Sequence, residues 1–266
     1  MSQLFQAPKL DLDDLEVIDD INSIRDELAS VLRPPKRWTG GLRRTSQARA
    51  IQGSNSIEGY TVTEQDAVAA VEDEPPLSAD DRTWAEILAY RRVLTYVVNV
   101  GAEPGFEIDE SSIRSMHFML LEHELSKSPG RYRTGPIYVQ DEAGGHPVYE
   151  GPDPAAVPNL MRSLAAALSS RDGDAMVRAA MAHLNLVMIH PFRDGNGRMA
   201  RALQTMVLAQ DQVLEPTFSS IEEWLGHNTQ HYYNVLAATG GGAWHPDRNT
   251  RLWVKFNLRA HHMQAQ

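Results

Sequence analysis

The 266-residue sequence contains no cysteine. This absence excludes disulfide bonds, thiolate metal sites and cysteine nucleophiles. It also fits a reducing compartment, so we expect a cytoplasmic protein. Long apolar runs are missing too, because none approaches the ~20 residues that a membrane-spanning helix needs. Segment 1–14 has no basic region followed by an apolar stretch, so we expect neither a leader peptide nor a membrane partner.

Positive charge is scarce as well. Lys and Arg number 25 against 35 Asp and Glu, which gives a formal net charge of -10. Non-specific binding to nucleic acids or to anionic membranes favours basic patches, so we expect no nucleic-acid partner. Any phosphate ligand must be attracted by local positive charge. The apolar content of 42% is sufficient for a well-formed core.

Helical periodicity dominates the sequence, and strand patterns are few, which predicts a mostly α fold. Amphipathic or apolar helices are expected over residues 10–32, 42–57, 63–71, 84–100, 113–125, 157–168, 174–189, 197–209, 221–224, 229–238 and 250–263. We expect a turn at Gly40-Gly41, a cap formed by Thr63 with Asp66, and a start of the fourth helix at Ser78.

The segment between residues 126 and 158 differs, because it is rich in glycine and proline. It contains two short runs typical of strands, 137–139 and 146–149. Residues 141–145 would link them. This pattern predicts a β-hairpin or flap.

Residues 190–201 are the stretch best suited to bind phosphate. Gly195 and Gly197 let the backbone approach a ligand closely, and a helix beginning at this point would direct its free N–H groups at an anion. Arg198 and Arg201 then lie on one helical face, spaced for successive phosphates. The pattern predicts a phosphate site at a helix N-terminus.

Two titratable residues of this stretch could take part in chemistry. His190 precedes the loop and could act as a base, and Asp194 could be a magnesium ligand. The alternative for Asp194 is a helix cap, since both roles use the same N-terminal geometry. His183, on the same predicted helix as His190, fits a packed structural histidine better than a second base.

The stretch 190–201 resembles the signature of the Fic family, His-x-Phe-x-Asp/Glu-Gly-Asn-Gly-Arg-x-x-Arg, and matches every fixed position. The resemblance covers roughly residues 111–256. It implies a Fic-type helical bundle with a short β-hairpin flap, and transfer of AMP from ATP onto a protein hydroxyl. On this basis residues 1–105 form an N-terminal helical region that carries an inhibitory helix (about 42–59). Residues 106–266 then form the catalytic core with its C-terminal helices.

The resemblance also implies roles for the first part of the signature. His190 would be the general base that takes the proton from a Ser, Thr or Tyr hydroxyl of the target. Phe192 would anchor the loop in the core. Asp194 would hold the Mg²⁺ that bridges the α- and β-phosphates.

The second part of the signature would bind the nucleotide. By position, Gly195, Asn196 and Gly197 would form the anion hole. Arg198 would contact the β-phosphate and Arg201 the γ-phosphate. Fixed positive charge at these points suits attack on the α-phosphate, because negative charge develops there.

A second stretch, Ser54 to Gly59, resembles the family's inhibitory motif Ser/Thr-x-x-x-Glu-Gly/Asn. The resemblance implies that Glu58 pairs with Arg201 and blocks the productive γ-phosphate position. Because the motif precedes the signature, the chain resembles the subclass whose inhibitory helix is N-terminal to the core. Taken alone, so short a pattern also occurs by chance in helices.

Two further sets of residues carry weaker parts of the resemblance. Ile137, Tyr138 and Val139 match the flap, which aligns a target segment by strand addition. Tyr232 and Tyr233 resemble residues that line the adenine side of the nucleotide site. Core packing is the alternative for this tyrosine pair.

The sequence therefore predicts a protein adenylyltransferase with ATP as substrate and Mg²⁺ as cofactor, inhibited by its own Glu58. Its partner would be a target protein with an exposed hydroxyl side chain, and a homo-oligomer is compatible with the sequence. One alternative is a hydrolase that removes AMP, with Glu58 positioning a water. The other is a nucleotide-sensing regulatory module without turnover.

Overall fold

The structure, a computed structural model, describes residues 4–32, 38–140, 147–211, 218 and 220–265. These residues form eleven α-helices, two 3₁₀ helices and one two-stranded sheet. The prediction of a mostly α chain with a short hairpin is confirmed. No helix in the described residues is both long enough and apolar enough to cross a bilayer.

The hairpin divides the helices into two groups along the chain. Before it lie α1 (Leu12–Leu32), α2 (Thr39–Ile57), α3 (Glu64–Val71), α4 (Asp81–Val100), α5 (Glu110–Leu121) and the 3₁₀ helix η1 (Leu125–Lys127). The hairpin itself consists of β1 (Tyr138–Gln140) and β2 (Pro147–Glu150). After it come η2 (Pro154–Ala156), α6 (Val157–Ser170), α7 (Ala175–Ile189), α8 (Asn196–Gln210), α10 (Glu222–His227), α11 (Thr229–Gly240) and α12 (Arg251–Ala265).

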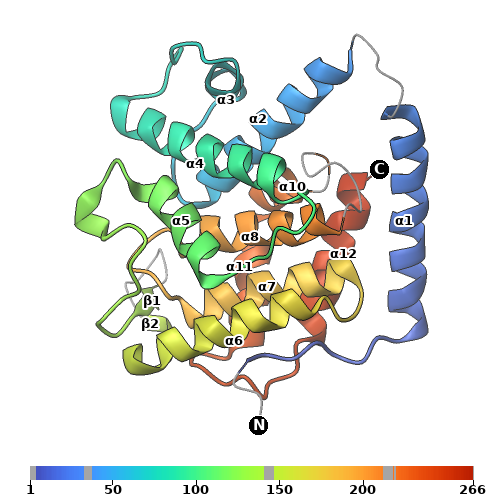
Figure 1. The fold of residues 1–266 in the computed structure, drawn as a ribbon, viewed down its shortest axis with the longest axis vertical. Helices are drawn as coiled ribbons and strands as arrows, with labels where there is room; N and C mark the ends of the chain where they lie inside the picture. The colour runs from blue at the N-terminus through green and yellow to red at the C-terminus, as the bar shows by residue number, and fades with distance from the viewer. Residues whose placement is uncertain (1–3, 33–37, 141–146, 212–217, 219, 266) are drawn as a thin grey trace.

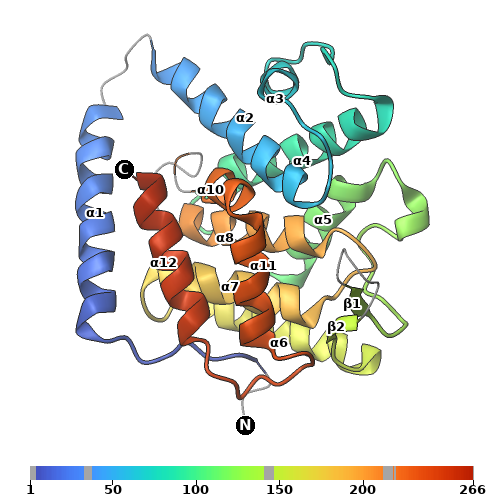
Figure 2. The same ribbon diagram turned by 180° about the vertical axis from the view of Figure 1, so that it is seen from behind.

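Helices α7 and α8 pack against each other at the centre of the molecule (Figure 1). Nearly every residue of both helices is buried, as expected for helices that are covered on all sides. Helices α5 and α6 cover one face of this pair, and α11 and α12 cover the other (Figure 2). The loop between α7 and α8, residues 190–195, is the first half of the signature.

Elements from the N-terminal part of the chain complete the core. The Phe5 amide donates to Asn185 Oδ1 of α7 at 2.9 Å, and α1 runs beside α12 (Figures 1 and 2). Helix α2 packs on α10, where Gly53 meets the Glu222 backbone so closely that a Cβ would not fit. One hydrophobic core therefore joins residues from both sides of position 105. The division into two regions stays a prediction.

Some helix starts differ from those expected. Gly40 and Gly41 lie inside the first turn of α2, so the expected turn there is wrong. The first-turn amides of a helix need no intrahelical partner, and glycine is tolerated there. Asp80, not Ser78, caps α4 through a 2.7 Å bond from the Thr83 amide. An Asp at this position is a strong N-cap.

The cap of α3 explains what Ser78 does instead. As predicted, Thr63 Oγ1 accepts from the Asp66 amide at 3.1 Å. The Asp66 carboxylate also accepts from the Ser78 hydroxyl at 2.6 Å and from the Ser78 amide at 2.9 Å. Ser78 therefore closes the loop before α4 back onto α3.

The hairpin is antiparallel and is attached to the bundle through β2. Tyr138 pairs with Glu150 and Val139 with Tyr149. The Tyr149 hydroxyl donates to the Met188 carbonyl of α7 at 2.8 Å, and the Glu150 amide donates to the Gly242 carbonyl at 2.9 Å. The predicted linker 141–145 lies outside the described residues.

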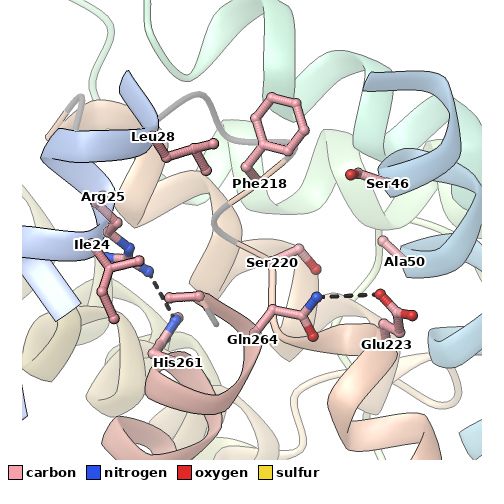
Figure 3. Close-up of a pocket in the computed structure, with 11 residues that line it drawn as sticks. Ile24, Arg25, Leu28, Ser46, Ala50, Phe218, Ser220, Glu223, His261 and Gln264 are labelled. Atoms are coloured by element: carbon pink, nitrogen blue, oxygen red, sulfur yellow. Dashed lines mark hydrogen bonds between the residues drawn. The ribbon is translucent and has the colours of Figure 1, made fainter. Parts of the chain in front are cut away.

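A cavity of about 110 Å³ lies between α1, α2 and α12 (Figure 3). Arg25 and His261 meet at its wall, where Arg25 Nη2 donates to His261 Nδ1 at 3.1 Å. Burial lowers the pKa of Arg25 to about 10. None of the lining residues belongs to the signature, so the cavity is separate from the candidate site.

Candidate active site

His190 ends α7 in a left-handed conformation, with φ 50°. This conformation is unfavourable for a residue with a side chain, and contacts from Arg133 hold it. Arg133 Nε donates to the His190 carbonyl, and the Arg133 amide donates to the Pro191 carbonyl, both at 2.8 Å. Arg133 thereby joins the base of the flap to the start of the signature loop.

The His190 ring is in a state suited to accept a proton. Its Nδ1 lies 3.2 Å from the Val187 carbonyl. Because a carbonyl oxygen only accepts, Nδ1 carries the proton and Nε2 keeps a free lone pair. Burial lowers the pKa of His190 to about 4, so the ring is neutral at pH 7.

The middle of the loop is fixed by Phe192. Its buried ring stacks on His117 of α5, with ring centroids 3.7 Å apart. Asn196 closes the loop, since its side chain bonds both the amide and the carbonyl of Phe192 at 2.9 Å. His117 Nε2 also contacts the Asp194 carbonyl at 3.0 Å. These contacts together hold the loop in one conformation.

Two glycines permit the turn into α8. Gly195 has φ 73°, a conformation that favours glycine. A Cβ at Gly197 would meet the Glu58 carboxylate, the end of a flexible side chain, so any larger residue there would displace Glu58. The first amides of α8 lack intrahelical partners and form the positive end of the helix. A carboxylate from the end of α2 thus already lies at the expected anion site.

Asp194 is ionised and reaches the solvent. Its Oδ1 accepts from the Gly195 amide at 2.7 Å, and its Oδ2 lies 2.9 Å from Lys127 Nζ. Burial opposes ionisation, but Lys127 and the Gly195 amide outweigh it and lower the pKa of Asp194. The N-cap residue of α8 is Gly195, whose amide is the one that Asp194 accepts from, and the choice between a metal ligand and a helix cap stays a prediction. An exposed anionic oxygen beside a candidate phosphate site is a suitable ligand for Mg²⁺.

Arg198 is buried and pairs with Glu86 of α4; both side chains are 2% exposed. Tyr60 lies under the guanidinium, with Arg198 Cζ 5.7 Å from the ring centroid. The sequence did not predict this pair. Glu86 gave no signal beyond its place on a helix.

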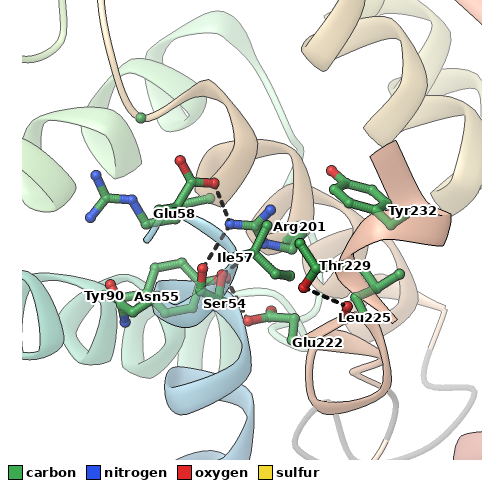
Figure 4. Close-up of polar contacts among 12 residues, drawn as sticks. Ser54, Asn55, Ile57, Glu58, Tyr90, Arg201, Glu222, Leu225, Thr229 and Tyr232 are labelled. Carbon is green, nitrogen blue, oxygen red and sulfur yellow. Dashed lines mark hydrogen bonds and ion pairs between the residues drawn. The ribbon is translucent and has the colours of Figure 1, made fainter. Parts of the chain in front are cut away.

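Arg201 is held by Ser54 and Glu58 of the second stretch (Figure 4). Its Nε donates to Ser54 Oγ at 2.8 Å, and its Nη2 donates to the Ser54 carbonyl at 3.0 Å and to Glu58 Oε1 at 2.7 Å. Burial alone would lower the pKa of Arg201, but the Glu58 charge outweighs burial and raises it.

The sequence after α2 explains the position of Glu58. Gly59 has φ 84°, its amide donates to the Ser56 carbonyl at 3.1 Å, and the Tyr60 amide donates to the Asn55 carbonyl at 3.2 Å. These bonds form a Schellman motif, which ends a helix at a left-handed glycine. Glu58 is therefore fixed as the last residue before the turn.

The two tyrosines of α11 have different surroundings. Tyr232 is 1% exposed, and its hydroxyl meets His183 Nε2 at 2.9 Å. His183 also contacts Gln204 at 2.7 Å, which agrees with a structural histidine. The Tyr233 hydroxyl donates to the Ile57 carbonyl at 3.0 Å. A contact of either tyrosine with adenine stays a prediction.

Arg133 connects the residues around the flap to the signature loop. Its Nη1 donates to the Gly135 carbonyl at 2.8 Å and its Nη2 to the Pro152 carbonyl at 2.6 Å. Tyr138 is 49% exposed, while Ile137 precedes β1 and accepts from the Gly151 amide at 3.2 Å. Within the described residues, β1 pairs only with β2, so no described strand pairs with its other edge.

Comparison with known proteins identifies this architecture. Residues 107–208, which include the loop and most of α8, match the Fic/DOC family. The chain carries a Fic domain. A Fic family protein from Desulfovibrio desulfuricans G20 superposes with a TM-score of 0.79 at 24% identity, over 98% of this chain and 75% of that one. The predicted Fic-type bundle is therefore confirmed.

Sequence similarity to known proteins extends beyond residues 107–208. The protein adenylyltransferase Fic of Nematostella vectensis is 31% identical over 208 residues, which cover 76% of this chain and 46% of that protein. The protein adenylyltransferase Fic of Drosophila melanogaster is 30% identical over 200 residues, which cover 72% of this chain and 38% of that protein. The chain thus spans less than half the length of these relatives.

Proposed function

We propose that this Fic protein is an adenylyltransferase that transfers AMP from ATP to a Ser, Thr or Tyr hydroxyl of a target protein. The observation that carries the proposal is the assembly of a neutral histidine, an ionised carboxylate and a helix N-terminus in one rigid loop of a Fic domain. The names of the two relatives support the same activity. The proposal takes ATP as the nucleotide, with Tyr232 and Tyr233 on the adenine side.

The reaction follows from the state of His190. As the target hydroxyl oxygen attacks the α-phosphorus, its proton passes to Nε2, which has a free lone pair. The bond between the α-phosphorus and the oxygen bridging to the β-phosphate breaks, and pyrophosphate leaves. The amides of residues 195–197, with Arg198 and Arg201, stabilise the charge that develops on the phosphates.

Asp194 is the residue that would hold Mg²⁺. A single carboxylate with substrate phosphates is a common Mg²⁺ site in proteins. When bound, the ion would neutralise charge on the α- and β-phosphates. Lys127 now pairs with Asp194, so it would share or give up this carboxylate when the substrate binds.

Glu58 inhibits the reaction in this proposal, which places the chain in the subclass with an N-terminal inhibitory helix. Its carboxylate takes the anion position at the start of α8 and the charge of Arg201. A γ-phosphate needs the same arginine and the same space. ATP then binds in an orientation that does not react.

The target would bind at the flap. The open edge of β1 can pair with an extended segment through main-chain hydrogen bonds, which tolerate many side chains. Residues Ile137, Tyr138 and Val139 would align the hydroxyl with His190.

The absence of cysteine supports a cytoplasmic location.

The test uses Glu58→Gly with α-labelled ATP and a lysate of the source organism. Label attached to protein supports the transferase. AMP released from a pre-modified target only when Glu58 is present would support the hydrolase instead. ATP binding without label transfer by Glu58→Gly would support a regulatory module and contradict the proposal.

A further inference from the structure

The buried carboxylate of Glu86 contacts both Arg198 and the segment that follows Glu58. One oxygen of Glu86 pairs with Arg198 Nη1, and the other accepts from the Tyr60 hydroxyl at 2.7 Å. Tyr60 stands two residues after Glu58. The same side chain therefore touches the first signature arginine and the segment that carries the inhibitory glutamate.

Water has little access to these two contacts, because the Glu86 carboxylate is 2% exposed. Breaking a buried pair leaves an uncompensated charge, so each partner strongly favours the geometry seen. His123 lies 3.3 Å from the same Glu86 oxygen that binds Tyr60. Glu86 is thus enclosed by Arg198, Tyr60 and His123.

The contacts of Arg198 show what Glu86 does for the nucleotide site. Nη1 is engaged by Glu86, the guanidinium lies over Tyr60, and Nε is buried without a hydrogen-bond partner among the described residues. A buried donor without a partner costs free energy, so an acceptor that reached Nε would stabilise this side chain. The arginine is thus oriented before the ligand arrives.

The contacts of Tyr60 show what Glu86 does for inhibition. The segment 57–60 is held at both ends. The Tyr60 hydroxyl donates to Glu86, and the Ile57 carbonyl accepts from the Tyr233 hydroxyl. Beside it lies an open cavity of about 590 Å³, lined by Glu58, Tyr60 and Arg82 among others. The segment therefore has room to move outward once the Tyr60 contact is lost.

We propose that Glu86 is a positioning residue with two tasks: it orients Arg198 toward the nucleotide phosphates, and through Tyr60 it holds Glu58 over Arg201. This inference rests on the proposed function. One carboxylate then determines both how Arg198 is oriented for ATP and how firmly Glu58 is held over Arg201.

The first task is tested in the Glu58→Gly background. Glu86→Gln keeps the shape of the side chain but removes its charge. We expect kcat/KM for ATP to fall at least tenfold, mainly through a higher KM, and Tyr96→Phe on the same helix to change it less than twofold. An unchanged KM for ATP in a folded Glu86→Gln variant would overturn this task.

The second task is tested with Tyr60→Phe, which keeps the ring under Arg198 and removes only the hydroxyl. We expect label transfer to rise at least threefold when Glu58 is present and to show no such rise in Glu58→Gly. No rise in the presence of Glu58 would overturn the anchoring role. Because this variant leaves Glu86 in place, it remains informative if Glu86→Gln does not fold.

A binding measurement separates this inference from the proposed function. If Glu58→Gly transfers no label, the proposed function fails. Calorimetric titration with ATP then still tests the first task, since adding Glu86→Gln to Glu58→Gly should weaken ATP binding at least tenfold. Equal ATP affinity of the single and double variants would overturn it.

Discussion

Glu58 and Arg201 are 143 positions apart in the sequence, yet their side chains meet at 2.7 Å. Arg201 is almost fully buried, whereas the Glu58 side chain is 23% exposed. The arginine is therefore a fixed part of the core, and the glutamate is the partner that can leave. This difference determines how variants of the two residues should behave.

Replacing Arg201 should not imitate replacing Glu58. In the proposed function, Arg201→Ala removes the partner of the inhibitory carboxylate, but it also removes the charge needed for the γ-phosphate. We expect its label transfer to stay at or below the wild-type rate, while Glu58→Gly rises at least tenfold. Equal activity of the two variants in the α-labelled ATP assay would show that the reaction does not need the Arg201 charge.

Ser54 supports Arg201, and its loss should cost stability. Ser54→Ala leaves a buried guanidinium N–H of Arg201 without its acceptor. We expect the free energy of unfolding to fall by about 1–3 kcal/mol, measured by denaturant titration. Ser56→Ala, close to Ser54 in α2 but exposed, is the control and should change it by less than about 0.5 kcal/mol. Equal losses in both would contradict the role of Ser54.

The pH dependence of transfer should reflect the low pKa of His190. Burial lowers that pKa to about 4, and the Glu58 charge raises it only in part. The base is therefore neutral throughout pH 6–8, and its protonation should slow transfer only as the pH approaches 4. We expect kcat/KM of Glu58→Gly to show no step near pH 6.5. A step at that pH, in a protein that stays folded across the range, would show that His190 has an ordinary pKa.

Glu222 should make stability fall as the pH rises. It lies beneath Ser54 (Figure 4), and burial raises its pKa to about 7 although the Tyr90 hydroxyl donates to it at 2.7 Å. The folded state holds the proton more tightly than the unfolded state, so this stability is present below pH 4.5 and is lost as the pH rises to about 7.

Glu222→Gln tests this linkage because it keeps the shape of the side chain without the charge. Relative to the wild type, the variant should gain up to about 3 kcal/mol between about pH 4.5 and 7, at about 1.4 kcal/mol per pKa unit. Thermal or denaturant unfolding at several pH values measures the gain. A difference that does not vary with pH would contradict a raised pKa.

The sequence predicted most helices of this fold because their apolar periodicity is local information. Helix starts were less predictable: both Ser78 and Asp80 can cap a helix, and only the contacts of Asp66 with Ser78 decide between them. The signature was also local, since its twelve residues are contiguous.

Contacts between distant elements could not be predicted in this way. Glu86 reaches Arg198 across 112 positions, and Lys127 reaches Asp194 from a separate 3₁₀ helix. A charged residue on a helix gives no sign of the element that it will meet in the core. Glu58 was an exception only because the stretch 54–59 resembles the inhibitory motif of the family.

His190 is, in the proposed function, the base of a reaction that Glu58 holds back. The most direct measurement compares the rate of label transfer from α-labelled ATP by the wild type, Glu58→Gly and Glu58→Gly with His190→Ala. We predict little transfer by the wild type, an increase of at least tenfold in Glu58→Gly, and loss of that increase in the double variant. Transfer by the double variant at the rate of Glu58→Gly would contradict the role of His190 as the base.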